Sequence, residues 1–264
     1  MAHVIAEVKD GVGTITLNRP ESLNALSEEM TKGMIDATSR FERDASVRCV
    51  LLKGAGDHFM AGGDVKGFHE RLKANQAEHA AGLEWRVNMM HAIIYSLRRM
   101  KKPTVVSVQG AAAGFGLSLM MSTDLAIASD DAFFTLAYAN IGFSADGGAT
   151  FWLPRLVGTR KALEIAYLAE RFDANKAKEL GIVNFVVPRA SLADETSKLV
   201  QRLAKGPTFA YGEVKALMHE SLETGFDAQL HREAEAIARC AASADHLEGV
   251  SAFVEKRKPA FKGK

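Results

Sequence analysis

Residues 104–121 read TVVSVQGAAAGFGLSLMM and carry the clearest structural signal in the chain. The first six residues are rich in β-branched side chains, which favour a strand. The remainder, from Gly110, is typical of a glycine-rich turn that leads into a helix. Similar strand-like runs recur at residues 49–52, 125–128, 133–136 and 182–187. Because these runs alternate with helical patterns as far as about residue 190, the sequence predicts an α/β core.

The N-terminal region begins with a hairpin signal. Residues 3–8 and 12–17 are strand-like and are joined at Asp10-Gly11, a pair that favours a type I′ turn. Ser27 is followed by two glutamates, which is typical of a helix N-terminus, because a hydroxyl caps the helix and acids suit its positive end. We expect this helix to end near Arg43.

Helices dominate the rest of the chain. A long helix is predicted from about Glu78 to Lys101, ended by Pro103. Its apolar stripe comprises Met89, Ile93, Leu97 and Met100. After the core, residues 1–190, we expect a helical C-terminal region, residues 191–264. Its helices are predicted at residues 191–204, 208–222, 226–241 and 245–256. Their apolar faces need a partner, either the core or another subunit.

Composition excludes several classes of protein. The 264 residues are 47% hydrophobic and 25% charged, which suits a folded globular protein. The net charge of +1 argues against a dedicated nucleic-acid binder. Cys49 and Cys240 have no CxxC spacing, and the eight histidines form neither HxxxH nor HExxH, so no metal site is indicated. Without a long apolar run or a signal peptide, we expect no membrane span and a cytoplasmic location.

Two glycine-rich segments are candidates for ligand binding. The first, residues 59–66, reads FMAGGDVK, and the second, residues 110–116, reads GAAAGFG. Small residues let a ligand approach the backbone, and free N–H groups at a helix start attract negative charge. An ordinary turn with Asp64 as the helix cap is the alternative for the first segment. Two such turns on neighbouring strands could direct two backbone N–H groups at one oxygen, which forms an oxyanion hole.

Asp146 is the candidate acid–base residue. Because it precedes an apparent helix, it could be only an N-cap. It could instead be a carboxylate base in an apolar pocket, since Phe143, Phe151 and Trp152 lie near it in the sequence. Desolvation in such a pocket would raise its pKa towards the working pH. Spacing alone leaves both interpretations open.

Ser118 and His91 give weaker signals. Ser118 does not lie in a G-x-S-x-G motif, because Met120 replaces the last glycine, so it is interpreted as a small helix residue. His91 is predicted on the polar side of its helix, where a solvated histidine is the simplest interpretation.

Five segments appear in a fixed order along the chain. They are Asn18-Arg19-Pro20-x-x-x-Asn24-Ala25-Leu26, Ala61–Lys66, Gly110-x-x-x-Gly114-x-Gly116, Ile141–Gly148 and Ala252–Lys258. This ordered set strongly resembles the crotonase, or enoyl-CoA hydratase/isomerase, superfamily from about residue 5 onward. The resemblance implies a spiral of ββα units and a helical C-terminal region that forms a trimer, often a dimer of trimers. It also implies an acyl-CoA thioester substrate, with CoA as part of the substrate and no separate cofactor.

The resemblance also implies roles for single residues. The backbone N–H groups of Gly63 and Phe115 would hold the thioester oxygen and stabilise an enolate, and Asp146 would be catalytic. Ala61 would meet the adenine and Lys66 the CoA phosphates. The other residues that the resemblance places at the substrate are Leu23, His91, Gly114, Ser118 and Tyr138, together with Phe253 and Lys256, which would reach the CoA of a neighbouring subunit.

This sequence departs from the family pattern at three positions, Ser118, Tyr138 and Phe115. Hydratases of the family carry two glutamates, and Ser118 and Tyr138 stand at the matching positions. Asp146 matches the single acid of monofunctional enoyl-CoA isomerases and one of the two acids of dienoyl-CoA isomerases. It also matches the nucleophile of 4-chlorobenzoyl-CoA dehalogenase, of which His91 matches a histidine while Tyr138 replaces a tryptophan. Phe115 stands where the family usually has glycine.

The sequence therefore predicts an acyl-CoA enzyme that moves a double bond. Asp146 would take a proton from the carbon next to the thioester and return it further along the acyl chain. One carboxylate suffices, because isomerisation consumes no water. The alternatives are an enoyl-CoA hydratase of fatty-acid or aromatic-acid degradation, a hydrolytic dehalogenase, and an acyl-CoA binder or assembly subunit without catalytic activity.

Overall fold

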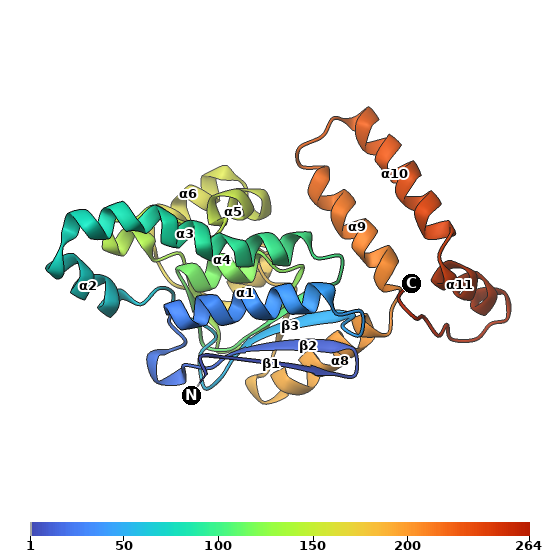
Figure 1. Ribbon diagram of the computed structural model, residues 1–264, viewed down its shortest axis with the longest axis horizontal. Coiled ribbons are helices and arrows are strands. Elements are labelled where there is room, and N and C mark those ends of the chain that lie inside the picture. The colour runs from blue at the N-terminus through green and yellow to red at the C-terminus, as the bar shows by residue number, and fades with distance from the viewer. Residues whose placement is uncertain (1) are drawn as a thin grey trace.

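Two β-sheets form the centre of the computed structural model, which describes residues 2–264 (Figure 1). Met1 lies outside the described residues. The larger sheet has six strands in the order β1-β2-β3-β4-β6-β9, and the smaller has three in the order β5-β7-β8. All pairs are parallel except β1–β2 and β7–β8. The strands are β1 (Val4–Lys9), β2 (Val12–Leu17), β3 (Cys49–Gly54), β4 (Thr104–Val108), β5 (Ala111–Ala113), β6 (Leu125–Ser129), β7 (Phe133–Thr135), β8 (Phe172–Asp173) and β9 (Phe185–Val187).

Helices connect these strands and form the C-terminal region, so the predicted α/β class is confirmed. The four C-terminal helices were each predicted to within two residues. The α-helices are α1 (Glu28–Arg43), α2 (Val65–Ala74), α3 (Gln76–Arg99), α4 (Phe115–Met121), α5 (Ala149–Val157), α6 (Thr159–Leu168), α7 (Ala174–Glu179), α8 (Leu192–Ala204), α9 (Thr208–Glu220), α10 (Phe226–Ala241) and α11 (Ala244–Val254). The single-turn helices are η1 (Pro20–Ser22), η2 (Tyr138–Ile141) and η3 (Arg189–Ser191).

Local signals explain the first elements. Asp10 and Gly11 both have positive φ angles, 50° and 78°, as a type I′ turn requires, and they join β1 and β2. The side chain of Ser27 accepts a hydrogen bond from the amide of Met30 at 3.1 Å and caps α1. Both predictions are confirmed, including the end of α1 at Arg43.

The apolar face of α3 agrees with the predicted stripe at every position except one. Met89 is 42% exposed, so its place in the stripe was wrong, and the neighbouring Met90 is buried instead. Ile93, Leu97 and Met100 are buried as predicted. The stripe follows the positions 90, 93, 94 and 97, which share one helix face through spacings of three and four residues.

The two faces of the larger sheet are covered by different parts of the chain. Helices α1 and α3 lie over one face, and α8 lies over the other (Figure 1). The first C-terminal helix therefore finds its partner in the core of the same chain. The cluster under α8 comprises Val12, Cys49, Leu51, Val105, Ile127, Leu192, Val200 and Ala204.

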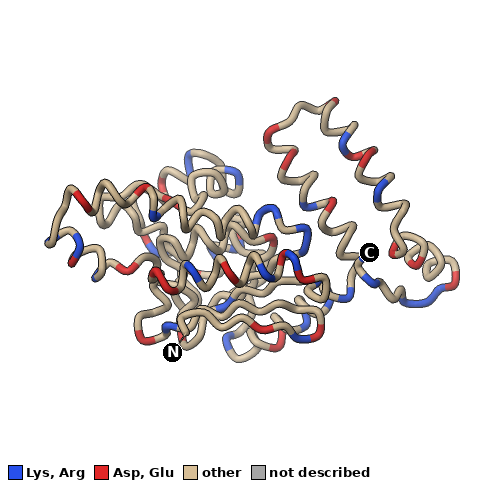
Figure 2. The backbone as a smooth tube through the Cα atoms, viewed as in Figure 1, with Lys and Arg blue, Asp and Glu red and all other residues tan. Residues whose placement is uncertain are grey.

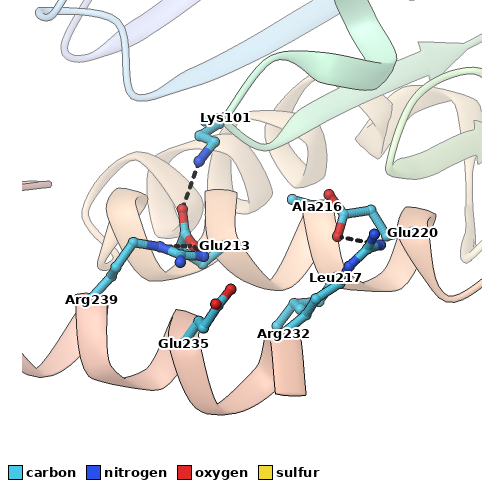
Figure 3. Close-up of a pocket in the computed structure, with 8 residues that line it drawn as sticks. All are labelled: Lys101, Glu213, Ala216, Leu217, Glu220, Arg232, Glu235 and Arg239. Atoms are coloured by element: carbon cyan, nitrogen blue, oxygen red, sulfur yellow. Dashed lines mark hydrogen bonds and ion pairs between the residues drawn. The ribbon is translucent and has the colours of Figure 1, made fainter. Parts of the chain in front are cut away.

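The next two helices, α9 and α10, project away from the sheets as an antiparallel pair (Figure 1). Buried Glu213 on α9 accepts hydrogen bonds from Lys101 at 2.7 Å and from Arg239 on α10 at 2.5 Å (Figure 3). Burial alone would raise the pKa of Glu213, but these two cations outweigh it and hold the pKa below its ordinary value. The cavity beside this cluster, about 290 Å³, is lined mainly by charged side chains. Ion pairs thus tie the projecting helices to the core.

Helices α10 and α11 leave large apolar side chains uncovered. Phe226 is 77% exposed, Ile237 73%, Leu247 71% and Phe253 87%. Large apolar side chains that stay exposed in this way are candidates for an interaction site. Of the helices in residues 2–264, none combines the length and the apolar character that crossing a bilayer requires.

Candidate active site

The two glycine-rich loops lie side by side beyond the ends of β3 and β4. The amide of Met60 donates to the carbonyl of Ala111, and the amide of Ala113 donates to the carbonyl of Met60, both at 2.9 Å. The second loop contains β5, a strand that the sequence analysis missed. A Cβ atom on Gly116 would lie 2.4 Å from the carbonyl oxygen of Met60, so only glycine permits this approach.

This pairing brings two unused amide donors into one place. Phe115 is the first residue of α4, where an N–H group has no partner within the helix. The N–H groups of Gly63 and Phe115 form no hydrogen bond within residues 2–264. Gly62 directly precedes Gly63. A Cβ atom on Gly62 would lie 3.7 Å from the nitrogen of Phe115, so the two loops are in contact there. Two such donors can hold one developing oxyanion.

Asp146 does not cap a helix. Helix α5 begins at Ala149 with Gly148 in the cap position, and no side chain caps it. The N-cap interpretation was therefore wrong. The carboxylate of Asp146 instead accepts a hydrogen bond from the hydroxyl of Tyr138, whose oxygen lies 3.1 Å from Oγ of Ser118. A hydrogen-bonded chain thus links Ser118, Tyr138 and Asp146.

The electrostatics of this hydrogen-bonded chain favour Asp146 as a proton acceptor. Burial raises the pKa of Asp146 above its ordinary value, although the Tyr138 hydrogen bond and nearby His91 act in the opposite direction. Burial and the charge of Asp146 raise the pKa of Tyr138, so the phenol stays protonated and donates. The result is a carboxylate with increased basicity and one oxygen held in place.

His91 lies next to this carboxylate. It is half-buried, and its Nε2 atom accepts a hydrogen bond from the amide of Gly147 at 3.3 Å. The prediction of a simply solvated histidine was therefore wrong. A Cβ atom on Gly147 would lie 2.8 Å from Ser118 and 2.9 Å from the ring of Phe115, so the Asp146 segment packs directly against α4.

The aromatic residues near Asp146 in the sequence separate in space. Phe143 packs on Phe68 of α2, with ring centroids 6.1 Å apart. Phe151 and Trp152 instead lie against the guanidinium of Arg98, at 4.8 and 5.4 Å from its carbon. The apolar wall beside the candidate site therefore comes from Phe143 and Phe68. The contribution of Phe68 was missed, because no local signal shows which residue of α2 meets a partner 75 positions later.

A groove of about 540 Å³ runs along the loop before α1 and the start of α2. Leu23 and Lys66 line it, and the amide of Ala61 donates to the carbonyl of Leu23 at 3.0 Å. Asp64 caps α2 through Gly67, which confirms the cap interpretation, and also pairs with Arg19 at 3.0 Å. The structure thus brings together the residues that were predicted to contact CoA near Gly63.

Hydrogen bonds of Asn24 hold in place the loop that lines this groove. The side-chain amide of fully buried Asn24 donates to the carbonyls of Ala55 and His58, at 2.9 and 2.8 Å. Its oxygen accepts from the amide of Arg19 at 2.8 Å. These bonds fix the loop that presents Leu23.

Phe253 and Lys256 are not near this site within one chain. They belong to the end of α11 and the segment after it, which lie far from α2 and α4 (Figure 1). The segment after α11 is rich in Lys and Arg (Figure 2). Arg257 in it pairs with Glu248 and Glu255, so part of the basic charge is neutralised. Over residues 2–264, no group of three or more His, Cys, Asp or Glu side chains is arranged to hold a metal ion.

A known protein family and several characterised relatives match the chain over nearly its whole length. A family model described as enoyl-CoA hydratase/isomerase matches residues 7–264. The chain is 35% identical to 1,2-epoxyphenylacetyl-CoA isomerase of Escherichia coli (strain K12), with 100% of both chains covered. It is 32% identical to crotonyl-CoA hydratase of Syntrophomonas wolfei, with 98% of this chain and 97% of the relative covered.

The solved structures agree with the sequence matches. An enoyl-CoA hydratase from Polaromonas sp. JS666 superposes with a TM-score of 0.92 at 30% identity, over 98% of this chain and 99% of that one. The fold predicted from the ordered motifs is therefore confirmed.

Proposed function

The chain belongs to the enoyl-CoA hydratase/isomerase family, and from this premise we propose that it is an enoyl-CoA isomerase with Asp146 as its single acid–base group. The observation that carries the proposal is the position of Asp146. It is the carboxylate of the Ser118–Tyr138–Asp146 chain, and its segment packs against the helix whose first N–H group is unused.

The proposed reaction is a proton transfer along the acyl chain. The thioester oxygen accepts hydrogen bonds from the N–H groups of Gly63 and Phe115. The carboxylate of Asp146 takes a proton from the carbon next to the thioester, and the electron pair of that C–H bond moves into the thioester as an enolate. Conjugation extends the enolate over the neighbouring double bond. The proton returns two carbons further along, and the double bond moves into conjugation with the thioester.

The residues around Asp146 support this cycle. Tyr138 holds one carboxylate oxygen by donating to it, which leaves the other oxygen for the substrate. Burial raises the pKa of Asp146 above its ordinary value, which makes the carboxylate a stronger base for the proton that it takes up and returns. CoA is part of the substrate, and we propose no separate cofactor.

Hydration is the alternative function, because crotonyl-CoA hydratase is among the relatives. Hydration must both deprotonate a water and protonate the carbon next to the thioester. The positions that carry the two hydratase glutamates hold Ser118 and Tyr138, which are not carboxylates. Asp146 alone would have to perform both transfers, so isomerisation is favoured.

A panel of thioesters tests the proposal. We expect 3-enoyl-CoA thioesters to be converted to conjugated 2-enoyl-CoA thioesters without a change in mass. Mass spectrometry separates the alternatives, because hydration adds one water and isomerisation adds nothing. Faster hydration than isomerisation across the panel would support the hydratase. Binding without turnover of any member would support a non-catalytic acyl-CoA binder.

We also propose that the chain assembles as a homotrimer or as a dimer of trimers. The exposed apolar side chains of α10 and α11 support this, because a second copy could cover them. Phe253 and Lys256 would then complete the CoA site of a neighbour. Light scattering should give three or six times the chain mass of 28.6 kDa. A stable monomer at micromolar concentration would contradict the proposal.

A further inference from the structure

One cluster of side chains in the structure lacks hydrogen-bond partners. Four buried side-chain nitrogen atoms in the described chain have none: both ring nitrogens of His79, Nε of Arg71 and Nε of Arg86. We call these three residues the His79 cluster. Buried polar atoms in folded proteins are nearly always bonded, so a group of unbonded ones calls for a physical account.

The cluster is positively charged and closely packed. His79 is only 5% exposed, and the carbonyl of the same residue accepts a hydrogen bond from the guanidinium of Arg86 at 2.7 Å. Neither Arg71 nor Arg86 forms an ion pair with any carboxylate in residues 2–264. Burial and the two guanidinium groups hold the pKa of His79 below its ordinary value. The charge of Arg71 also lowers the pKa of nearby Asp64, so the cluster offers to an acceptor the cation of Arg86, the partly compensated cation of Arg71 and a neutral imidazole.

Phe68 connects this cluster to the candidate active site. Its ring lies 6.1 Å from the ring of His79 and 5.4 Å from the guanidinium carbon of Arg71. The same ring lies 2.9 Å from the position of a Cβ atom on Gly63, and it packs on Phe143. One aromatic side chain thus separates a candidate oxyanion donor from the His79 cluster. An acyl chain that leaves the thioester along Phe68 and Phe143 would end there.

The groove of about 540 Å³, where we expect CoA to bind, is lined by other residues of α2 than Phe68 and Arg71. Lys66, Gly67 and Glu70 line that groove, whereas Phe68 faces His79 on α3. This arrangement favours the acyl group, rather than the CoA phosphates, as the occupant of the cluster. Helix α2 has no fully buried residue, and half-buried Phe68 is the residue whose ring packs on His79 of α3.

We propose that the His79 cluster binds a carboxylate at the far end of the acyl group, so that the enzyme prefers CoA thioesters of dicarboxylic acids. This inference rests on the proposed acyl-CoA function. A guanidinium fork matches a carboxylate in charge and geometry, and the imidazole can donate a further hydrogen bond. Phe68 and Phe143 would pack against the carbon chain between the two ends.

Binding of saturated thioesters tests this without depending on turnover. Adipoyl-, pimeloyl- and suberoyl-CoA are compared by calorimetry with hexanoyl-, heptanoyl- and octanoyl-CoA, which differ only in the terminal carboxylate. We expect at least one dicarboxylic thioester to bind about ten-fold more tightly than its partner, since a desolvated charge pair is worth at least this much. Arg71→Gln should abolish the preference and leave the affinity for the monocarboxylic partner unchanged. Lys73→Gln is the matched control, because it removes one positive charge from an exposed position of the same helix.

Each other outcome overturns the inference in a recognisable way. Equal affinity within every pair would mean that the cluster does not read the acyl end. A persistent preference in Arg71→Gln, or an equal loss in Lys73→Gln, would mean that general charge attraction causes it. If Arg71→Gln weakened the binding of free CoA by the same factor as the binding of the dicarboxylic thioester, the cluster would bind a CoA phosphate instead. If no thioester bound at all, the proposed function itself would be wrong.

Discussion

We expect Asp146→Asn to lower kcat for enoyl-CoA isomerisation by about 10²–10⁴-fold while the thioester still binds. The amide is close in size to the carboxylate and can still accept the hydrogen bond from Tyr138. It cannot take a proton from carbon, and the chain offers no second carboxylate at Ser118 or Tyr138. Steady-state kinetics and calorimetry with acetoacetyl-CoA measure the two quantities separately.

Folding should not explain the loss of activity. Burial raises the pKa of Asp146, so the ionised carboxylate is less favourable in the folded chain than in the unfolded one. This group therefore lowers stability progressively as the pH rises from its ordinary pKa through the raised one. At neutral pH, Asp146→Asn removes that penalty, and its urea midpoint should match or exceed that of the wild type. Ser118→Ala should change kcat far less, since a hydroxyl is not the base.

The pH profile gives a second control on the same residue. The wild-type kcat/KM should fall as the pH drops through the raised pKa of Asp146, because the protonated acid cannot act as a base. The residual activity of Asp146→Asn should lack this acid limb. Comparable turnover in variant and wild type, on a substrate that the wild type converts, would contradict the assignment.

The fold was predictable where the sequence signals are local. A turn dipeptide such as Asp10-Gly11 and a cap such as Ser27 act over a few residues, and the structure places both as expected. Strand β5 was missed because its three alanines carry no strand propensity. Its conformation comes from pairing with β7, where Ala112 lies opposite Phe134, and from the bridge to Met60.

The error on Asp146 has a backbone cause. An acid followed shortly by a helical pattern resembles a cap, but Gly147 and Gly148 both adopt positive φ angles, 60° and 80°. These two turns delay the helix to Ala149 and direct the carboxylate towards Tyr138 instead. The contact between Asp146 and Tyr138 could therefore not be predicted from the spacing of residues along the chain.

The sequence also could not predict which surface covers the apolar face of each helix. Helices α8 and α10 are both strongly amphipathic, yet Val200 of α8 is buried against the sheet while Ile237 of α10 is 73% exposed. Amphipathicity shows that a face needs a partner and does not identify it. The His79 cluster was missed for the same reason, since Arg71 and His79 meet only because α2 folds back on α3.

Replacement of Phe115 by proline tests the oxyanion hole, since proline removes the backbone donor itself. Phe115 is the first residue of α4, where proline is well tolerated because the N–H group has no partner in the helix. The preceding residue is Gly114, which lacks the Cβ atom that usually clashes with a following proline ring. Phe115→Ala is the matched control, because it loses the same ring and keeps the N–H group.

We expect kcat of Phe115→Pro to lie about 10²–10³-fold below that of Phe115→Ala, which is the usual effect of removing one oxyanion donor. The ring of Phe115 is 3% exposed, so each variant should lose about 3–5 kcal/mol of unfolding free energy, and this common loss cancels in the comparison. Matching circular dichroism spectra and urea midpoints would establish that both variants are folded. Equal kcat values in two such folded variants would show that the N–H group of Phe115 does not stabilise the enolate, and Gly63 would then need a different partner.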